Sequence, residues 1–204
     1  MKFLRTNMLV MFLLSACTVS TVKHLKETST DITSFKNPYF ADAEKDYVYK
    51  TNITAYSHQF GGLMIIKKMA NRHHRIVFTT EMGNKMFDAE LNNGNFKINF
   101  IVEQLDRKAL IHTLEKDFSI LLQDNVDVVQ SFENEYFRVY KSSLDKRFNY
   151  YFTNKTNRQL EKIINTTKTK EKVEISFKSK DGLTADFVLI EHKDIKLKVQ
   201  LVAI

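Results

Sequence analysis

RIVFTTEMGNKMFDAEL, residues 75–91, is typical of a β-hairpin. Two β-rich segments, RIVFTTE (75–81) and KMFDAEL (85–91), flank Gly83-Asn84, a pair that favours a tight turn. Met82 does not fit this pattern, because it places a flexible apolar side chain where the chain turns through solvent. Either this side chain is exposed for a purpose, or it folds back under the sheet as part of the core.

Strand-like segments continue on both sides of this hairpin. Residues 47–55 alternate with a period of two, and LMIIKK (63–68) and NFKINFIV (95–102) are further short strand patterns. The expected breaks are Gly61-Gly62, Asn71-Arg72-His73 and Asn92-Asn93-Gly94. Because the connections are so short, the strands must pair antiparallel as a meander.

One segment departs from the period of two. DRKALIHTLEKDFSILLQ (106–123) places its apolar residues on one face at helical spacing, with Asp106 as the expected N-cap. Strand patterns return near 135–140 and at 147–153, 160–166, 173–179, 185–192 and 195–204. The predicted fold class is mainly β (α+β), with about ten strands in a curved antiparallel sheet that forms an incomplete β-barrel under a helical lid.

The N-terminus, MKFLRTNMLVMFLLSAC, has a basic start and an apolar run from Met8 to Leu14. That run is far shorter than the roughly 20 residues of a membrane-spanning helix, so residues 1–16 are predicted to be a signal peptide. Leu14-Ser15-Ala16-Cys17 resembles the lipobox of bacterial lipoproteins, which implies cleavage before Cys17 and its acylation. The alternative is an ordinary signal peptide with an incidental cysteine.

The expected domain organisation follows from this anchor. Residues 17–44 are predicted to be an acylated cysteine with a flexible tether, and residues 45–204 a single domain. Cys17 is the only cysteine, so no disulfide within the chain is possible. Without Lys2 and Arg5, 31 basic residues become 29, and 29 against 24 acidic residues gives a net charge of +5. This excess is mild and spread out, and together with export it argues against a nucleic-acid partner.

No catalytic motif is present in the sequence. A nucleophile elbow, a zinc-protease helix motif and a phosphate-binding glycine loop are all missing, and we predict neither an enzyme nor a cofactor. His73-His74 is more consistent with a solvated turn than with a metal site. Glu133 and Glu135 are more consistent with a polar rim than with a glycosidase pair.

Aromatic residues are abundant, with 16 Phe and 8 Tyr. They could form an ordinary filled core or line an apolar pocket for one hydrophobic ligand. The candidate lining residues are Ile65, Phe78, Phe87, Phe96, Phe100, Phe118, Phe148, Phe152 and Phe177.

The order of elements resembles the LolA/LolB-like family of bacterial lipoprotein carriers. Glu81-Met82-Gly83 matches that family's Pro-Leu-Gly hairpin, and Gly182-Leu183-Thr184 before the last strand pair matches its Gly-Leu-Pro turn. The chain departs from the family pattern in both prolines, replaced by Glu81 and Thr184, and in the hairpin leucine, replaced by Met82.

The resemblance implies a half-barrel that binds acyl chains or another lipid, with Met82 and Gly83 in a loop that contacts the membrane. It also implies an outer-membrane lipoprotein, since Thr18 is not the aspartate that retains lipoproteins in the inner membrane. No acidic run of the sort that sends some lipoproteins to the cell surface follows Cys17, so the periplasmic side is expected. Such a protein would receive lipoproteins from a periplasmic LolA-like carrier. The alternative is a non-enzymatic envelope scaffold with a filled core.

Overall fold

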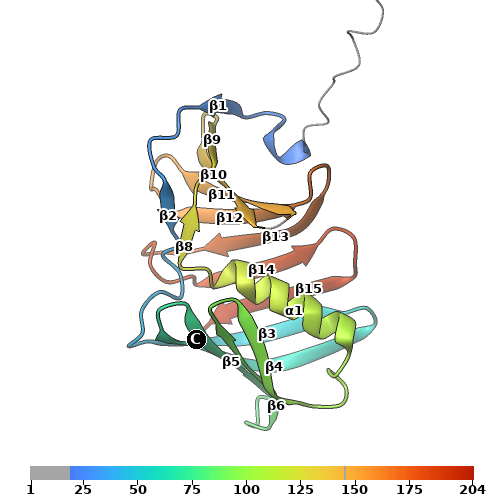
Figure 1. Cartoon of the computed structure of the whole chain (residues 1–204). Coiled ribbons are helices and arrows are strands. Elements are labelled where there is room, and N and C mark those ends of the chain that lie inside the picture. Colours follow the sequence, from blue (N-terminus) through green and yellow to red (C-terminus); the bar gives the residue numbers. More distant parts are fainter. Residues whose placement is uncertain (1–18, 145) are drawn as a thin grey trace, which may run out of the picture.

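The computed structural model describes residues 19–144 and 146–204, so Cys17 and the signal peptide lie outside the described residues. Thirteen strands form one antiparallel sheet in the order β1-β9-β10-β11-β12-β13-β14-β15-β3-β4-β5-β6-β7. Figure 1 shows this sheet curved around the helix α1, with β1 and β9 at one end of the molecule and β5 and β6 at the other. The sheet does not close between β1 and β7, which confirms the predicted incomplete barrel.

The element bounds confirm the predicted meander and add short strands that the sequence pattern did not reveal. The first half contains η1 (Ser20–Val22), β1 (Lys26–Thr28), β2 (Ser34–Lys36), β3 (Asp46–Ala55), β4 (His58–Ala70), β5 (His73–Thr79), β6 (Lys85–Asn92) and β7 (Asn95–Ile101). The second half contains α1 (Lys108–Leu121), β8 (Asn125–Asp127), β9 (Gln130–Glu133), β10 (Phe137–Leu144), β11 (Arg147–Asn154), β12 (Leu160–Thr166), β13 (Glu171–Lys178), β14 (Phe187–His192) and β15 (Leu197–Ala203). Strands β2 and β8 pair only with each other.

The helix α1 lies across the concave face of the sheet (Figure 1). Its buried residues include Leu114, Phe118 and Leu121, as the helical spacing predicted. The predicted N-cap is wrong, because Arg107 occupies that position and its side chain makes no capping hydrogen bond. Asp106 instead ends a tight turn in which its backbone N–H donates to the Val102 carbonyl at 3.1 Å.

Gly61-Gly62 is not the turn that the sequence pattern indicated. Strand β4 runs through both glycines, and the chain reverses earlier, near Tyr56, whose φ is 56°. Gly62 is required for another reason, because a Cβ atom there would lie 1.9 Å from the Thr79 carbonyl oxygen. The glycine therefore allows the close approach of β4 and β5 rather than a change of direction.

Residues 26–40 differ from the predicted flexible tether. Strand β1 pairs with β9, and β2 pairs with β8. Asn37 is completely buried, and its side-chain amide donates to the Leu121 carbonyl at 3.0 Å. Tyr39 is 2% exposed and donates its hydroxyl to the Leu160 carbonyl. The many Ser, Thr and Lys residues of this segment concealed its docking, because few large apolar side chains mark it in the sequence.

Apolar residues pack on both faces of the sheet. The interior cluster fills the concave side and includes residues of β3–β6, β11–β15 and α1. A second group, the outer cluster, packs on the opposite face of β9–β12 and consists of Val19, Phe132, Val139, Tyr150, Phe152 and Ile164, with Val22, Leu25, Phe137 and Phe148 partly buried against them. The chain immediately before β1 therefore covers part of the outer face.

Candidate functional site

An apolar interior lies between α1 and the strands β3–β6. The side chains around its centre are all apolar: Ile53, Met64, Phe78, Phe87, Leu105, Leu110, Leu114 and Phe118. The strand residues reach this space because alternate side chains of a strand share a face, while Leu110, Leu114 and Phe118 share one face of the helix. The surface is suited to an apolar ligand, and these eight side chains offer no polar group to a reacting molecule.

This interior is closed in the structure. Its central cavity has a volume of about 10 Å³, while ligand pockets in proteins typically measure about 300–1,000 Å³. The α1 side chains occupy the space that a ligand would need. An acyl chain could enter only if α1 moved away from the strands.

Five of the predicted lining residues belong to this interior. Phe78, Phe87 and Phe118 surround the central cavity. Phe96 is half-buried and stacks between Phe87 and Phe118, with ring centroids 6.2 and 6.4 Å away. Phe177 is buried in the same cluster and packs against Tyr39 at 4.8 Å between ring centroids.

Four predicted lining residues lie elsewhere. Ile65 points to the outer face, because its neighbours Met64 and Ile66 are the buried interior residues of β4. Phe148 and Phe152 belong to the outer cluster. Phe100 is 44% exposed, because a register shift between Ile98 and Phe100 reverses which side chains of β7 face inward.

The β5–β6 hairpin presents Met82 to solvent, with 92% of the residue exposed. Thr80 donates its backbone N–H to the Asn84 carbonyl and Gly83 donates to the Thr80 carbonyl, both at 2.9 Å, and Gly83 has a φ of 85°. The predicted turn is therefore confirmed. Exposure of Met82 also rules out the alternative that it folds back into the core.

Charged residues stabilise the base of this hairpin. Asp88 on β6 is 1% exposed and accepts hydrogen bonds from Arg75 at 2.8 and 3.1 Å and from Lys85 at 2.8 Å. The Arg75 guanidinium, the largest influence, and the Lys85 ammonium hold the pKa of Asp88 well below its usual range. This charged network therefore links the two strands of the hairpin that carries Met82.

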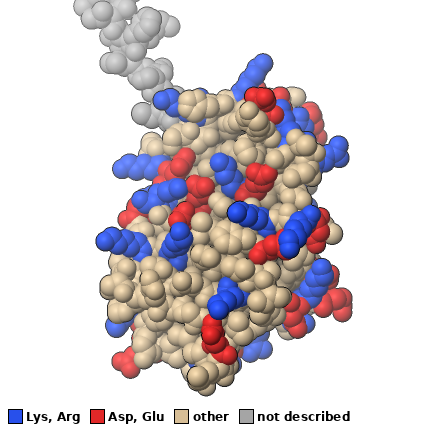
Figure 2. All heavy atoms as spheres, turned by 180° about the vertical axis from the view of Figure 1, so that it is seen from behind, with Lys and Arg blue, Asp and Glu red and all other residues tan. Residues whose placement is uncertain are grey.

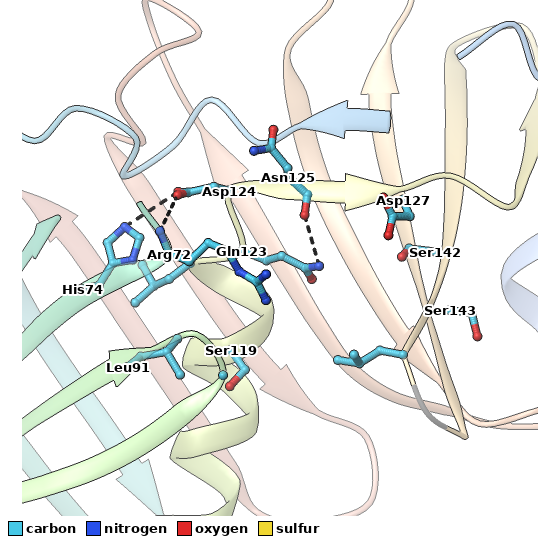
Figure 3. A pocket seen from close by; sticks show the side chains of 13 residues that line it. Arg72, His74, Leu91, Ser119, Gln123, Asp124, Asn125, Asp127, Ser142 and Ser143 are labelled. Atoms are coloured by element: carbon cyan, nitrogen blue, oxygen red, sulfur yellow. Dashed lines mark hydrogen bonds and ion pairs between the residues drawn. The ribbon is translucent and has the colours of Figure 1, made fainter. Parts of the chain in front are cut away.

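A polar cavity of about 450 Å³ opens beside the C-terminal end of α1 (Figure 3). Its lining includes guanidinium, hydroxyl, amide and carboxylate groups from Arg72, Ser119, Gln123, Asn125, Asp127, Ser142 and Ser143, together with the apolar side chains of Leu91, Leu122 and Leu144. Asp124 forms its inner wall and contacts Lys68 at 2.9 Å and the Arg72 backbone N–H at 3.3 Å. This cavity can form hydrogen bonds with a polar group, whereas the interior beside it can accept only apolar atoms.

A buried polar contact joins α1 to the sheet. Asp117 of α1 lies 2.9 Å from Nε2 of His192 on β14, and both side chains are almost completely buried. Burial raises the pKa of Asp117, while the hydrogen bond with His192 opposes this shift. Its second carboxylate oxygen, Oδ1, is buried and has no hydrogen-bond partner among the described residues. Sequence reasoning missed this contact, because nothing in the pattern connects positions 75 residues apart.

The described residues contain no group of three or more His, Cys, Asp or Glu side chains that could hold a metal ion. Within 19–144 and 146–204, no helix is long and apolar enough to cross a membrane. The predicted solvated turn is wrong for His73-His74, because both residues lie on β5: His73 contacts Glu90 at 3.1 Å, and the buried His74 contacts the Phe40 carbonyl at 3.0 Å. Glu133 forms ion pairs with Arg138 and Lys155.

Together these features define a curved antiparallel sheet that encloses an apolar interior under one helix. The same fold occurs in a LolA superfamily protein from Nitrosomonas europaea, which superposes with a TM-score of 0.50 at 7% sequence identity over 80% of this chain and 86% of that one. A domain from Vibrio parahaemolyticus described as an outer membrane lipoprotein-sorting protein aligns with a TM-score of 0.42 at 8% identity, over 80% of this chain and 85% of that one.

No protein-family model matches the chain, and no curated protein matches its sequence. The superposition on the Nitrosomonas europaea protein confirms the predicted LolA/LolB-like architecture at the level of the fold.

Proposed function

We propose that this protein is a non-enzymatic lipoprotein that binds an acyl chain or another lipid in the interior beneath α1. The observation that carries the proposal is the all-apolar lining shared by α1 and strands β3–β6. Burial of apolar surface there supplies affinity at about 25 cal/mol per Å². The polar cavity at the end of α1 offers hydrogen-bonding groups to the polar end of such a ligand.

The proposal requires α1 to act as a movable lid. The closed interior has a volume of about 10 Å³, so binding exchanges helix side chains for ligand atoms. The outcome would be sequestration of the lipid from water, without covalent chemistry. This fits a role in receiving or inserting acylated proteins, with a soluble periplasmic carrier of LolA type as the donor.

Acylation of Cys17 and location at the periplasmic side of the outer membrane belong to the same proposal. They rest on the lipobox-like Leu14-Ser15-Ala16-Cys17, on Thr18 and on the lack of an acidic run after Cys17. Mass spectrometry of the mature N-terminus tests the acylation directly, and Cys17→Ala should release the protein from the membrane fraction. An unmodified Cys17 in the mature chain would contradict it.

The binding itself is tested with the soluble Cys17→Ala chain. We expect lipid to copurify after gentle extraction and a fluorescent fatty acid to bind. Met64→Gln should weaken binding several-fold, because Met64 lines the interior. The matched control is Ile65→Gln on the same strand, whose side chain faces outward and should leave binding unchanged.

A second function is favoured by the same closed interior. With almost no free volume, the domain could be a scaffold that docks onto an envelope partner. A Cys17→Ala chain that is lipid-free, binds no fatty acid and shows the same thermal stability with and without lipid would support the scaffold and refute the carrier.

A further inference from the structure

The first described residues are attached to the outer face of the sheet. Val19 is 5% exposed and packs in the outer cluster, where Val22 and Leu25 lie against it. Backbone hydrogen bonds shape this short segment, since Val22 donates to Val19 at 3.3 Å and Leu25 donates to Val22 at 3.0 Å. Residues 19–25, which we call the docking segment, are thus folded onto β9–β12.

Polar contacts hold the same segment. The hydroxyls of Thr21 and Ser20 donate to the Glu171 carboxylate at 2.6 and 3.0 Å. Strand β1 follows at once and pairs with β9, with Lys26 opposite Glu133 and Thr28 opposite Ser131. Within the described residues, the chain is therefore held against the sheet from Val19 onward.

The docking segment and the Met82 hairpin lie at opposite ends of the molecule. The segment contacts strands as far along the sheet as β13, where Glu171 lies; β13 is sixth in the sheet order, whereas β6 is twelfth, six strand spacings away. At about 4.8 Å per spacing, these strands are separated by roughly 29 Å along the sheet. Figure 1 shows η1 at one end and the β5–β6 turn at the other.

We propose that the outer face next to the docking segment is the membrane-facing surface, and that the Met82 hairpin points away from the membrane that holds the anchor. The inference rests on the proposed acylation of Cys17. Only two peptide steps separate Cys17 from Val19, so their Cα atoms can be at most about 7 Å apart. An acyl anchor there holds this end of the domain at the head groups.

The surface near the docking segment fits a zwitterionic lipid layer. Figure 2 shows the face opposite α1, where Lys and Arg are interspersed with Asp and Glu in the half nearest the grey N-terminal atoms. Lys141 and Lys162 lie over the rings of Phe148 and Phe152, with their Nζ atoms 4.6 and 4.5 Å from the ring centroids. These lysines shield the aromatic rings, so the face rests on head groups rather than inserting between acyl chains.

This arrangement changes the role expected of Met82. With the docking segment in place, the hairpin lies at the end of the molecule that is far from the anchor. Its apolar tip is presented to the aqueous side, where it would meet a partner that arrives with its own apolar surface.

Site-specific labels test the orientation in the full acylated chain. Cys17 is the only cysteine and would be occupied by the anchor, so one introduced cysteine is the only free thiol. We would label His24→Cys in the docking segment and Asn84→Cys in the hairpin, both exposed, and reconstitute each chain in phosphatidylcholine–phosphatidylethanolamine vesicles with a head-group quencher. Quenching should be several-fold stronger at position 24 than at position 84. Equal or stronger quenching at position 84 would overturn the proposal.

A loosened segment provides the control. Val19→Asp with Thr21→Ala should detach the docking segment and reduce the difference between the two labels. If the difference persists undiminished in this variant, the docking segment does not set the orientation.

Two separate measurements test the packing of the docking segment on the sheet and the acylation of Cys17. In soluble Cys17→Ala, the Leu25 amide should exchange with solvent several-fold more slowly than in the loosened variant, and equally fast exchange would overturn the docking. A mature chain without acyl groups would instead overturn the proposed anchoring, whatever the exchange rate.

Discussion

Gly62 shows how a single missing side chain allows two strands to approach. A Cβ atom there would meet the Thr79 carbonyl oxygen at 1.9 Å and a Phe78 ring carbon at 3.1 Å. The first contact is with backbone, so it cannot be relieved by a rotamer change. Strands β4 and β5 must separate locally to accept any larger residue.

Gly62→Ala should therefore lower the free energy of unfolding by about 1–3 kcal/mol, the usual cost of overpacking. Gly61→Ala is the matched control, since a Cβ atom at Gly61 would have nothing within 4 Å and should change stability by less than about 1 kcal/mol. Urea unfolding of the soluble Cys17→Ala chain measures both. Equal effects of the two substitutions would contradict the close approach.

Met82 makes a different prediction, because it is almost fully exposed. Met82→Glu should leave the free energy of unfolding within about 0.5 kcal/mol of wild type while impairing lipid or lipoprotein transfer. Leu183→Glu, at another loop residue that is 64% exposed, is the control and should leave transfer intact. A transfer assay between vesicles distinguishes the two, and equal loss in both variants would remove any special role for the hairpin.

At the scale of elements, α1 is held by apolar packing and by the buried Asp117–His192 contact. Arg147 and Lys116 also act on Asp117, but burial is the largest influence and raises its pKa. A carboxyl group whose pKa is raised by folding favours the folded state most at pH values below its unfolded pKa, near 3.8. This contribution is lost as the pH rises through the folded-state pKa.

The stability advantage of wild type over Asp117→Asn should accordingly decrease as the pH increases from about 3.8 upward. Urea unfolding at a series of pH values measures the difference. Asp106→Asn, at an exposed position just before α1, is the control for the replacement of an aspartate by an amide. An advantage that grows with pH would mean that the ion pair, rather than burial, dominates at Asp117.

The sequence predicted where the strands and the helix lie better than it predicted which face of each strand points into the interior. Alternation located the strands and the helix, but it cannot say which of two apolar faces is the interior. Phe148 and Phe152 pack in the outer cluster, to which the docking segment contributes Val19, Val22 and Leu25 from more than 100 residues earlier. Phe100 faces out because a register shift, invisible in composition, interrupts β7.

The polar parts of the site could not be predicted for a similar reason. Lys68 on β4 and Asp124, in the connection after α1, form an ion pair although they are 56 residues apart in the sequence. Asp117 and His192 meet only because α1 crosses the concave face. Met82 was found from sequence alone, since its exposure depends on a local turn.

At the scale of the whole molecule, the docking segment is part of the folded domain. Removal of the docking segment together with β1 would expose outer-cluster side chains, including Phe132, Tyr150 and Phe152, and would leave β9 as an edge strand. Exposed apolar surface and unpaired strand edges promote association.

A soluble chain that begins at residue 30 should thus be less stable than one that begins at residue 18, by about 2–5 kcal/mol for the loss of several half-buried to buried side chains. It should also self-associate. Urea unfolding and analytical ultracentrifugation measure the two effects. Equal stability of both chains would show that residues 19–29 behave as a tether after all.

The closed interior has a kinetic consequence. Leu114, Phe118, Ile120 and Leu121 of α1 are buried, and exposing four such side chains to water costs roughly 6 kcal/mol or more. Since about 1.4 kcal/mol is a factor of ten in population, the open form without ligand is rarer than about one molecule in 10⁴. If ligand enters only after α1 opens, the observed loading rate stops rising at high ligand concentration and equals the opening rate of the helix. A partner that binds α1 or replaces its contacts would then raise the loading rate, whereas a higher lipid concentration would not.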